Sequence, residues 1–190
     1  MNAATSRFTI FQTRWGHFGL ACRRESVCAT SLPTPTRAAA QEALLANLPA
    51  APADALFEQG LCPALQQRII AYFEGENVDF STDPGVDLAS YSSFGQAIMA
   101  GCRQIAFGQT RTYSELAHHA GRPGAARAVG GTMARNPVPL IVPCHRVVRT
   151  DGGLGGFSAS GGIATKRRML LHEQNAIAAA MPPAALVVTA

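Results

Sequence analysis

The 190-residue sequence is poor in lysine, tryptophan and tyrosine, with one lysine, one tryptophan and three tyrosines. It has no charge-free apolar run of about 18 residues, the length that a membrane-spanning helix needs, so we expect no membrane association. Residues 1–13 hold no charged segment followed by an apolar stretch, and we expect no secretory signal. The five cysteines lack the spacing of a disulfide framework, which favours a reducing, cytoplasmic location.

Metal-binding and nucleotide-binding patterns are also missing. Cys22, Cys28 and His17 lie close together in the sequence, but no fourth ligand at zinc-site spacing accompanies them. We therefore interpret these cysteines as core residues and predict no bound metal. The glycine-rich segment 152–162 has no Gly-x-x-x-x-Gly-Lys-Ser/Thr motif, so we expect its N–H groups to bind a polar ligand edge rather than a nucleotide.

The charge is distributed unevenly along the chain. Residues 1–100 carry six arginines and nine acidic residues, whereas residues 101–190 carry ten basic and three acidic residues. This asymmetry favours a polyanion-binding C-terminal half joined to a support domain, with an ordinary basic surface as the alternative. A content of 47% hydrophobic and 15% charged residues is typical of a globular protein with one domain or two small ones.

The N-terminal half predicts strands followed by helices. Alternating apolar residues indicate short strands between Phe8 and Leu32, and an alanine-rich helix is expected at 36–48, ended by Pro49. An amphipathic helix is predicted at 61–73. The remaining predictions are a connector at 51–54 and a turn-rich domain boundary within 77–91.

The C-terminal half predicts helices. The first begins near Ser92, with an apolar face made of Phe94, Ile98, Cys102 and Ala106. Next comes a short helix for which Ser114 is a candidate N-cap and Gly121 the residue after its end. A turn at 122–124 leads to a second helix at 125–135, which makes a helix-turn-helix candidate.

That second helix carries little side-chain bulk. Ala126 and Gly130 let its backbone approach a ligand closely, while Arg127 and Arg135 supply long cationic side chains. Such a helix can lie in a narrow groove and contact phosphates or stack on bases. Close helix packing with a solvated Arg127 is the alternative.

A cysteine beside cationic residues is the strongest chemical signal. In the run Pro143-Cys144-His145-Arg146, the imidazole and the guanidinium can lower the pKa of the thiol and make it a nucleophile. A structural cysteine next to a surface His-Arg pair is the alternative. A last helix is predicted at 163–174, with the only lysine, Lys166, near its start.

Several ordered motifs resemble one known family. Tyr113-Ser-Glu-Leu-Ala, Ala125-Ala-Arg-Ala-Val-Gly-Gly131, Asn136-Pro-Val-Pro, Pro143-Cys-His-Arg-Val-Val148 and the segment 166–173 are similar to the O6-alkylguanine-DNA alkyltransferases, or methylated-DNA–protein-cysteine methyltransferases. The resemblance implies an α/β fold with a ribonuclease-H-like domain at 1–88 and a mostly helical domain with a helix-turn-helix at 89–176. We expect a C-terminal tail at 177–190.

The resemblance implies DNA repair by a single, irreversible transfer of an alkyl group from O6 of guanine to Cys144. In the family, the matching histidine (His145) deprotonates the thiol through a water, and the matching glutamate (Glu173) orients that histidine. Asn136 is expected to brace the active-site segment. Tyr113 and the Ser158 amide are expected to assist the leaving guanine. No cofactor is required, and activity on O4-alkylthymine stays open.

The implied partner is double-stranded DNA that carries O6-alkylguanine. We expect the protein to act as a monomer in the cytoplasm and, in a bacterium, to associate with the nucleoid. Arg127 is expected to enter the base stack while the damaged base flips out. The expected DNA contacts are Tyr113, Ala126, Arg127, Gly130 and Arg135. Helix-turn-helix proteins in general use the major groove, but the resemblance and the small-residue helix favour the minor groove.

The expected substrate pocket contains Met133, Pro139, Val147, Phe157 and Ser158. Phe157 stands where many family members have tyrosine, so the apolar wall is kept and a hydroxyl is lost. The loop after it is longer by Ala159 and Ser160 than in the family members compared.

Two other classes of function are consistent with parts of the sequence. A DNA-binding protein could recognise alkylated DNA without repairing it, but relatives of that kind lack the acceptor cysteine. A cysteine hydrolase could use Cys144 and His145, but it would not account for the basic helix-turn-helix candidate.

Overall fold

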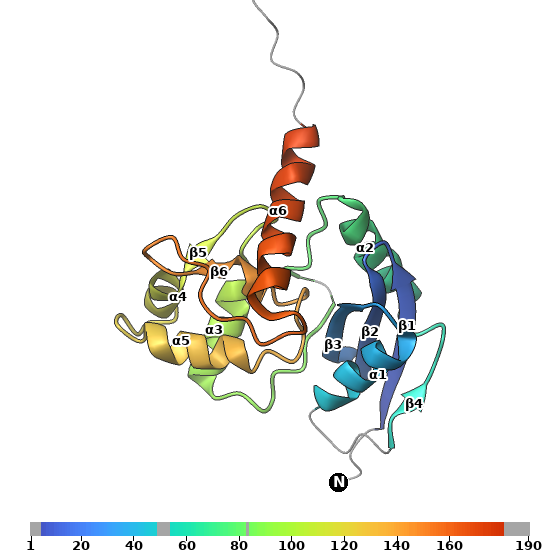
Figure 1. Cartoon of the computed structure of the whole chain (residues 1–190). Helices are drawn as coiled ribbons and strands as arrows, with labels where there is room; N and C mark the ends of the chain where they lie inside the picture. The colour runs from blue at the N-terminus through green and yellow to red at the C-terminus, as the bar shows by residue number, and fades with distance from the viewer. Residues whose placement is uncertain (1–4, 49–53, 83, 181–190) are drawn as a thin grey trace, which may run out of the picture.

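The computed structural model describes residues 5–48, 54–82 and 84–180. Figure 1 shows a sheet with helices α1 and α2 in the N-terminal half and a group of short helices in the C-terminal half. The last helix, α6 (Gly162–Ala180), stands between the two halves.

The N-terminal sheet has four strands in the order β3-β2-β1-β4. The antiparallel strands are β1 (Ser6–Thr13), β2 (Gly16–Arg23) and β3 (Ser26–Thr34), and the short β4 (Leu56–Phe57) runs parallel to β1. The β1–β2 turn requires Gly16. Its φ is 124°, and a Cβ there would lie 2.4 Å from the carbonyl oxygen of Thr34.

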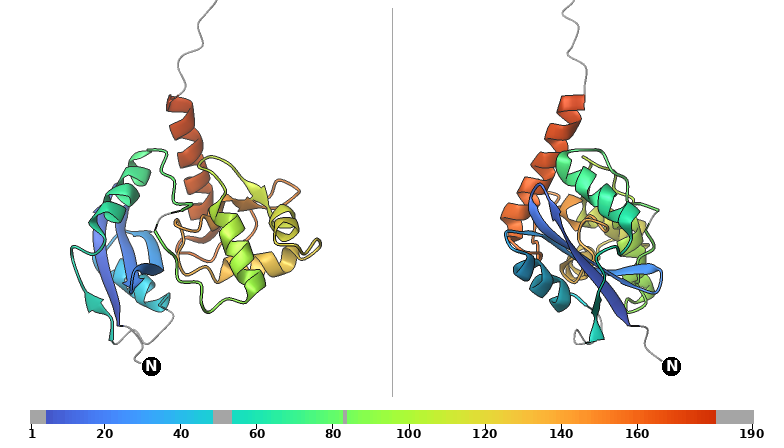
Figure 2. Two further views of the ribbon diagram at one scale, coloured as in Figure 1. Left: turned by 180° about the vertical axis from the view of Figure 1, so that it is seen from behind. Right: turned by 90° about the vertical axis from the view of Figure 1, so that its right-hand side faces the viewer.

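Helices cover both faces of the sheet. α1 (Arg37–Ala46) begins at Thr36, whose side chain accepts the amide of Ala39, and it packs on β2 and β3. α2 (Pro63–Glu74) packs on β1. Its buried residues include Leu65, Ile69 and Phe73, as the helical spacing predicts. The right-hand view of Figure 2 shows the twisted strands with α2 running across them.

The C-terminal half consists of short elements around the segment that carries Cys144. The helices are α3 (Ser93–Arg103), α4 (Tyr113–His119) and α5 (Ala126–Ala134), and Cys144–Arg146 form a 3₁₀ turn, η2. β5 (Arg111–Thr112) pairs in parallel with β6 (Val147–Val148). This pairing ties the start of α4 to the chain just after η2.

Three predictions about this half are wrong in detail. Thr112, not Ser114, is the N-cap of α4, because its side chain and that of Glu115 form a reciprocal capping box. Ala106 is exposed because α3 ends at Arg103, although Cys102 is fully buried as predicted. The last helix does not end at residue 174 as predicted, since α6 continues to Ala180. Pro49 and most of the connector predicted at 51–54 lie outside the described residues.

The two halves share one continuous apolar core. Thr30, on β3, also bonds to the segment before Cys144. Its amide donates to the carbonyl of Pro137 at 2.8 Å, and its hydroxyl donates to the carbonyl of Pro139 at 2.7 Å. The sheet therefore holds the chain that leads into the cysteine.

The N-terminal cysteines lie in the core or beside it. Cys28 is buried, and the buried Cys22 lies 3.5 Å from the exposed Cys62, Sγ to Sγ. Within the described ranges, no group of three or more His, Cys, Asp or Glu side chains is placed to hold a metal ion. Nor is any described helix both long and apolar enough to span a membrane.

We expect Thr30→Val to lower the free energy of unfolding by about 1–3 kcal/mol, because a buried carbonyl loses its donor while the side-chain shape is kept. Urea denaturation of the purified protein measures the change. Equal stability of the variant and the wild type would show that the Thr30–Pro139 bond is not a significant tie between the halves.

Candidate active site at Cys144

Cys144 is held in place by Asn136, at the start of the loop that follows α5. The Asn136 side-chain Nδ2 donates to the carbonyl of Val142 at 2.8 Å and to Cys144 Sγ at 3.2 Å, and its Oδ1 accepts the amide of Val138 at 3.1 Å. A single amide side chain thus fixes both the loop and the sulfur, because it can donate and accept at the same time.

Behind the cysteine, the carboxylate of Glu173 collects hydrogen bonds from three other segments of the chain. His145 Nε2 lies 2.7 Å from Oε1, and Arg146 binds both oxygens at 2.9–3.1 Å. Tyr72, on α2, donates to Oε1 at 2.8 Å, and the amide of Gly108 donates to Oε2 at 2.8 Å. Glu173, His145 and Tyr72 are all fully buried.

The hydrogen bonds fix the tautomer of His145. Because Nε2 faces the carboxylate, it carries the proton, which leaves Nδ1 as an acceptor. Nδ1 is buried and has no hydrogen-bond partner among the described protein atoms. A histidine in this state can take up a proton at Nδ1.

Burial and neighbouring charges set the ionisation of the site. Burial lowers the pKa of His145 from its usual 6.5, although Glu173 opposes this, so the imidazole is neutral at pH 7. Burial opposes ionisation of Glu173, but the hydrogen bonds and charges of His145 and Arg146 prevail and lower its pKa to about 2. Burial raises the pKa of the Cys144 thiol, against the effects of Asn136 and Lys166, so the resting thiol is protonated.

Cys144 opens onto a cavity of about 600 Å³. Its side chain is 7% exposed, which is enough for the sulfur to be reached from that cavity. The walls come from the start of α4, from α5 and from the loop before α6. Among the lining residues are Tyr113, Arg127, Met133, Phe157 and Ser158. The volume is that of a pocket for a small molecule or a single base.

The loop before α6 lies directly against Tyr113. Gly155 has a φ of 71°, and a Cβ there would come within 2.7 Å of the Tyr113 hydroxyl oxygen. Glycine at this position lets the loop approach the phenol closely. Burial raises the pKa of Tyr113, so its hydroxyl keeps its proton.

The structure gathers most of the residues that the sequence singles out, but not all of them. Ala126 and Gly130 line the cavity with Arg127. Val147 and Pro139 are buried but do not line it. Arg135 is exposed and lies outside the cavity, where its backbone carbonyl accepts the Tyr91 hydroxyl at 2.5 Å.

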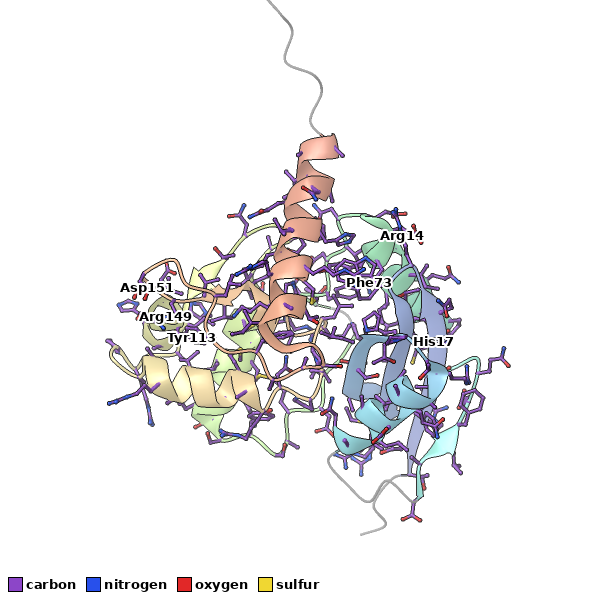
Figure 3. The ribbon with its side chains drawn as sticks, in the orientation of Figure 1. Arg14, His17, Phe73, Tyr113, Arg149 and Asp151 are labelled. Carbon is purple, nitrogen blue, oxygen red and sulfur yellow. The ribbon has the colours of Figure 1, made fainter. Side chains whose placement is uncertain are left out.

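The sequence reasoning missed four residues of the site. Arg146 was expected only as a cation beside the thiol, whereas its guanidinium binds the buried carboxylate of Glu173, which needs a cation. Lys166 is fully buried and donates to the carbonyl of Val147 at 2.5 Å, and Arg149 lines the cavity. Figure 3 places Arg149 and Asp151 on the same side of the molecule as Tyr113. Nothing in the local sequence pointed to Tyr72, which comes from the other half.

Comparisons with known proteins give matches to one family. The family model "6-O-methylguanine DNA methyltransferase, DNA binding domain" matches residues 93–175. The methylated-DNA–protein-cysteine methyltransferase of Mycobacterium leprae is 38% identical over 120 residues, which cover 63% of this chain and 70% of that protein. The protein of the same name from mouse is 56% identical over 69 residues, 36% of this chain and 32% of the mouse protein.

The fold matches solved structures over nearly its whole length. The crystal structure of Mycobacterium tuberculosis OGT in complex with DNA has a TM-score of 0.72 and 30% identity, and the match covers 90% of this chain and 94% of that one. A mixed α/β chain with a cysteine at a helix-lined cavity is thus similar to known alkyltransferases. The chain belongs to the methylated-DNA–protein-cysteine methyltransferase family.

The pKa directions predict how the stability depends on pH. Glu173 and His145 both have folded pKa values below their ordinary values of 4.5 and 6.5, so the unfolded chain binds more protons. Their stabilising contributions are present above pH 6.5 and are lost as the pH falls towards about 2. The free energy of unfolding should therefore rise with pH across this window.

The variant Glu173→Gln should flatten the part of that rise between about pH 2 and 4.5, because glutamine does not titrate. Denaturant unfolding at a series of pH values gives the slope for both proteins. An unchanged slope in the variant would contradict the ionisation assigned to Glu173.

Proposed function

We propose that this protein repairs DNA by transferring an alkyl group directly and irreversibly from O6 of guanine to Cys144. The observation that carries the proposal is the position of Cys144 Sγ, which lies at the cavity with Asn136 bonded to it and with the neutral His145 and Glu173 behind it. The family relationship supports the same reaction.

In this reaction the thiol must lose its proton before the sulfur attacks, because the thiolate is the nucleophile. His145 Nδ1 is the acceptor, and a water between the two side chains carries the proton to it. Glu173 then stabilises the imidazolium that forms. The S–C bond forms as the bond between the alkyl carbon and O6 breaks.

The departing guanine needs a proton, because its anion is a poor leaving group. Tyr113 lines the cavity and keeps its hydroxyl proton, so it can donate towards the base. The backbone amide of Ser158, another residue of the lining, is the second donor. The product is a thioether, which nothing in the described site can cleave, so each molecule reacts once.

We propose that α4 and α5 act as a helix-turn-helix on double-stranded DNA, with α5 in the minor groove. α5 presents Ala126, Gly130 and Arg127 on the side that lines the cavity. The small residues allow close approach, and the guanidinium of Arg127 can fill the gap in the base stack when the damaged guanine flips into the cavity. Arg149 also lines the cavity, where its guanidinium forms an ion pair with Asp151 at 2.7 Å.

The variant Cys144→Ser tests whether Cys144 accepts the alkyl group. Incubated with an oligonucleotide that contains O6-methylguanine, the wild type should gain one methyl group on Cys144, while the variant should gain none and still bind the DNA. Intact-protein mass spectrometry with peptide mapping measures this. Cys62→Ser is the matched control, because it removes an exposed thiol outside the cavity. An unmethylated wild type would refute the proposal.

The second prediction concerns Arg127→Ala. This change should slow the repair of duplex DNA at least about tenfold, because flipping costs a few kcal/mol that the guanidinium partly offsets. Reaction with the free base O6-benzylguanine should change little, since no stack is opened. Rate constants for the two substrates, measured on the same preparation, test this. Equal losses on both would exclude a role in base flipping.

A further inference from the structure

Tyr72 reaches the active site from outside the segment that the family model covers. Tyr72 lies on α2, whereas the family model matches residues 93–175. Its hydroxyl donates to Glu173 Oε1 at 2.8 Å, and the same oxygen accepts His145 Nε2 at 2.7 Å. One carboxylate oxygen is therefore shared between the catalytic histidine and a phenol from the N-terminal half.

The surroundings of Tyr72 hold its hydroxyl in one direction. The ring packs edge-to-face against Phe73 and Phe107, with centroids 5.1 and 5.8 Å away. Its backbone carbonyl faces His172 Nε2, on α6, at 2.6 Å. The side chain is fully buried. Burial raises the pKa of the phenol most, and the negative charge of Glu173 raises it further, so the phenol stays a neutral donor. The packing of the ring thus holds the Tyr72 hydroxyl in place to donate to Glu173.

A hydrogen bond donated to a carboxylate stabilises its charged form and weakens its pull on other protons. Without the Tyr72 hydroxyl, Glu173 would stabilise protonated His145 more strongly. A protonated His145 could not accept the proton of Cys144. The other charged groups near His145 are Arg146 and Lys166, which disfavour the imidazolium and would be unchanged by a substitution at position 72.

We propose that Tyr72 is a positioning residue of the alkyl-transfer site, whose hydroxyl fixes Glu173 Oε1 and limits the proton affinity of His145. The part of this proposal that concerns reaction rates rests on the function proposed above. The part that concerns the histidine does not, because the hydrogen bonds exist whatever the substrate. The N-terminal half then completes the catalytic relay as well as supporting it.

The test is Tyr72→Phe, which keeps the ring and removes only the hydroxyl. We expect the pKa of His145 to rise by about 0.5–1 unit in the variant. An NMR titration of the full-length protein with isotope-labelled histidine measures this pKa. The spectrum of His145→Gln identifies the resonance. Thr30→Val is the matched control, since it also removes a buried hydroxyl bond between the halves but does not touch Glu173. A His145 pKa that is unchanged by Tyr72→Phe overturns the proposal.

The second readout is the rate of methyl transfer as a function of pH. The acidic limb of the profile should move to higher pH in Tyr72→Phe by the same amount and stay in place in Thr30→Val. A shift of equal size in both variants would indicate loss of stability alone and overturn the proposal. A wild type that transfers no methyl group would refute the proposed function, while the NMR result would still decide the role of Tyr72.

A third measurement covers the case in which Tyr72→Phe does not fold. Replacing all tyrosines with 3-fluorotyrosine makes each phenol a stronger donor without removing it. The pKa of His145 should then fall below that of the unlabelled protein, the opposite direction to the phenylalanine variant. A rise or no change would overturn the proposal.

Discussion

The buried carboxylate of Glu173 is the constraint on which the rest of the structure depends. A charge without solvent is costly unless it is paired and fully hydrogen-bonded. Here the partners come from α2, from the residue after Phe107 and from η2, so their correct placement requires the whole chain to be folded. The need to satisfy one charge thus links the N-terminal half to the segment that carries the cysteine.

In the function proposed above, the same arrangement separates the residues that bind DNA from those that transfer the alkyl group. Arg127 and the small residues of α5 face the cavity from one side, and the relay lies behind Cys144 on the other. The cysteine is the one residue of the relay on the cavity lining. A substrate can therefore reach the sulfur while His145 and Glu173 stay buried away from bulk solvent, and this burial keeps the imidazole neutral.

Strands β1 to β3, the helices and the motif around Cys144 could be predicted from the sequence, because they depend on local periodicity, turn chemistry and motif spacing. The two-residue strands β4, β5 and β6 could not, because they are too short to show a periodicity. Helix ends were among the details that failed. Thr112 rather than Ser114 caps α4, because its hydroxyl accepts the amide of Glu115 and its own amide donates to the Glu115 carboxylate. The last helix continues beyond its predicted end at residue 174, because residues 175–180 contain neither glycine nor proline. The sequence marked Val147 and Pro139 as pocket residues, but the fold buries them beside the site.

The sequence by itself predicted the chemistry proposed for this protein, because Cys144, His145, Asn136 and Glu173 stand in motifs that resemble one family. Tertiary structure alone decided the protonation states and hydrogen-bond partners of those groups. The proton on His145 Nε2, the charge on Glu173 and the contact with Tyr72 arise from burial and from contacts between residues as many as 101 positions apart. Local patterns carry no information about such distances, since a hydrogen bond between remote segments exists only once the core that joins them has formed.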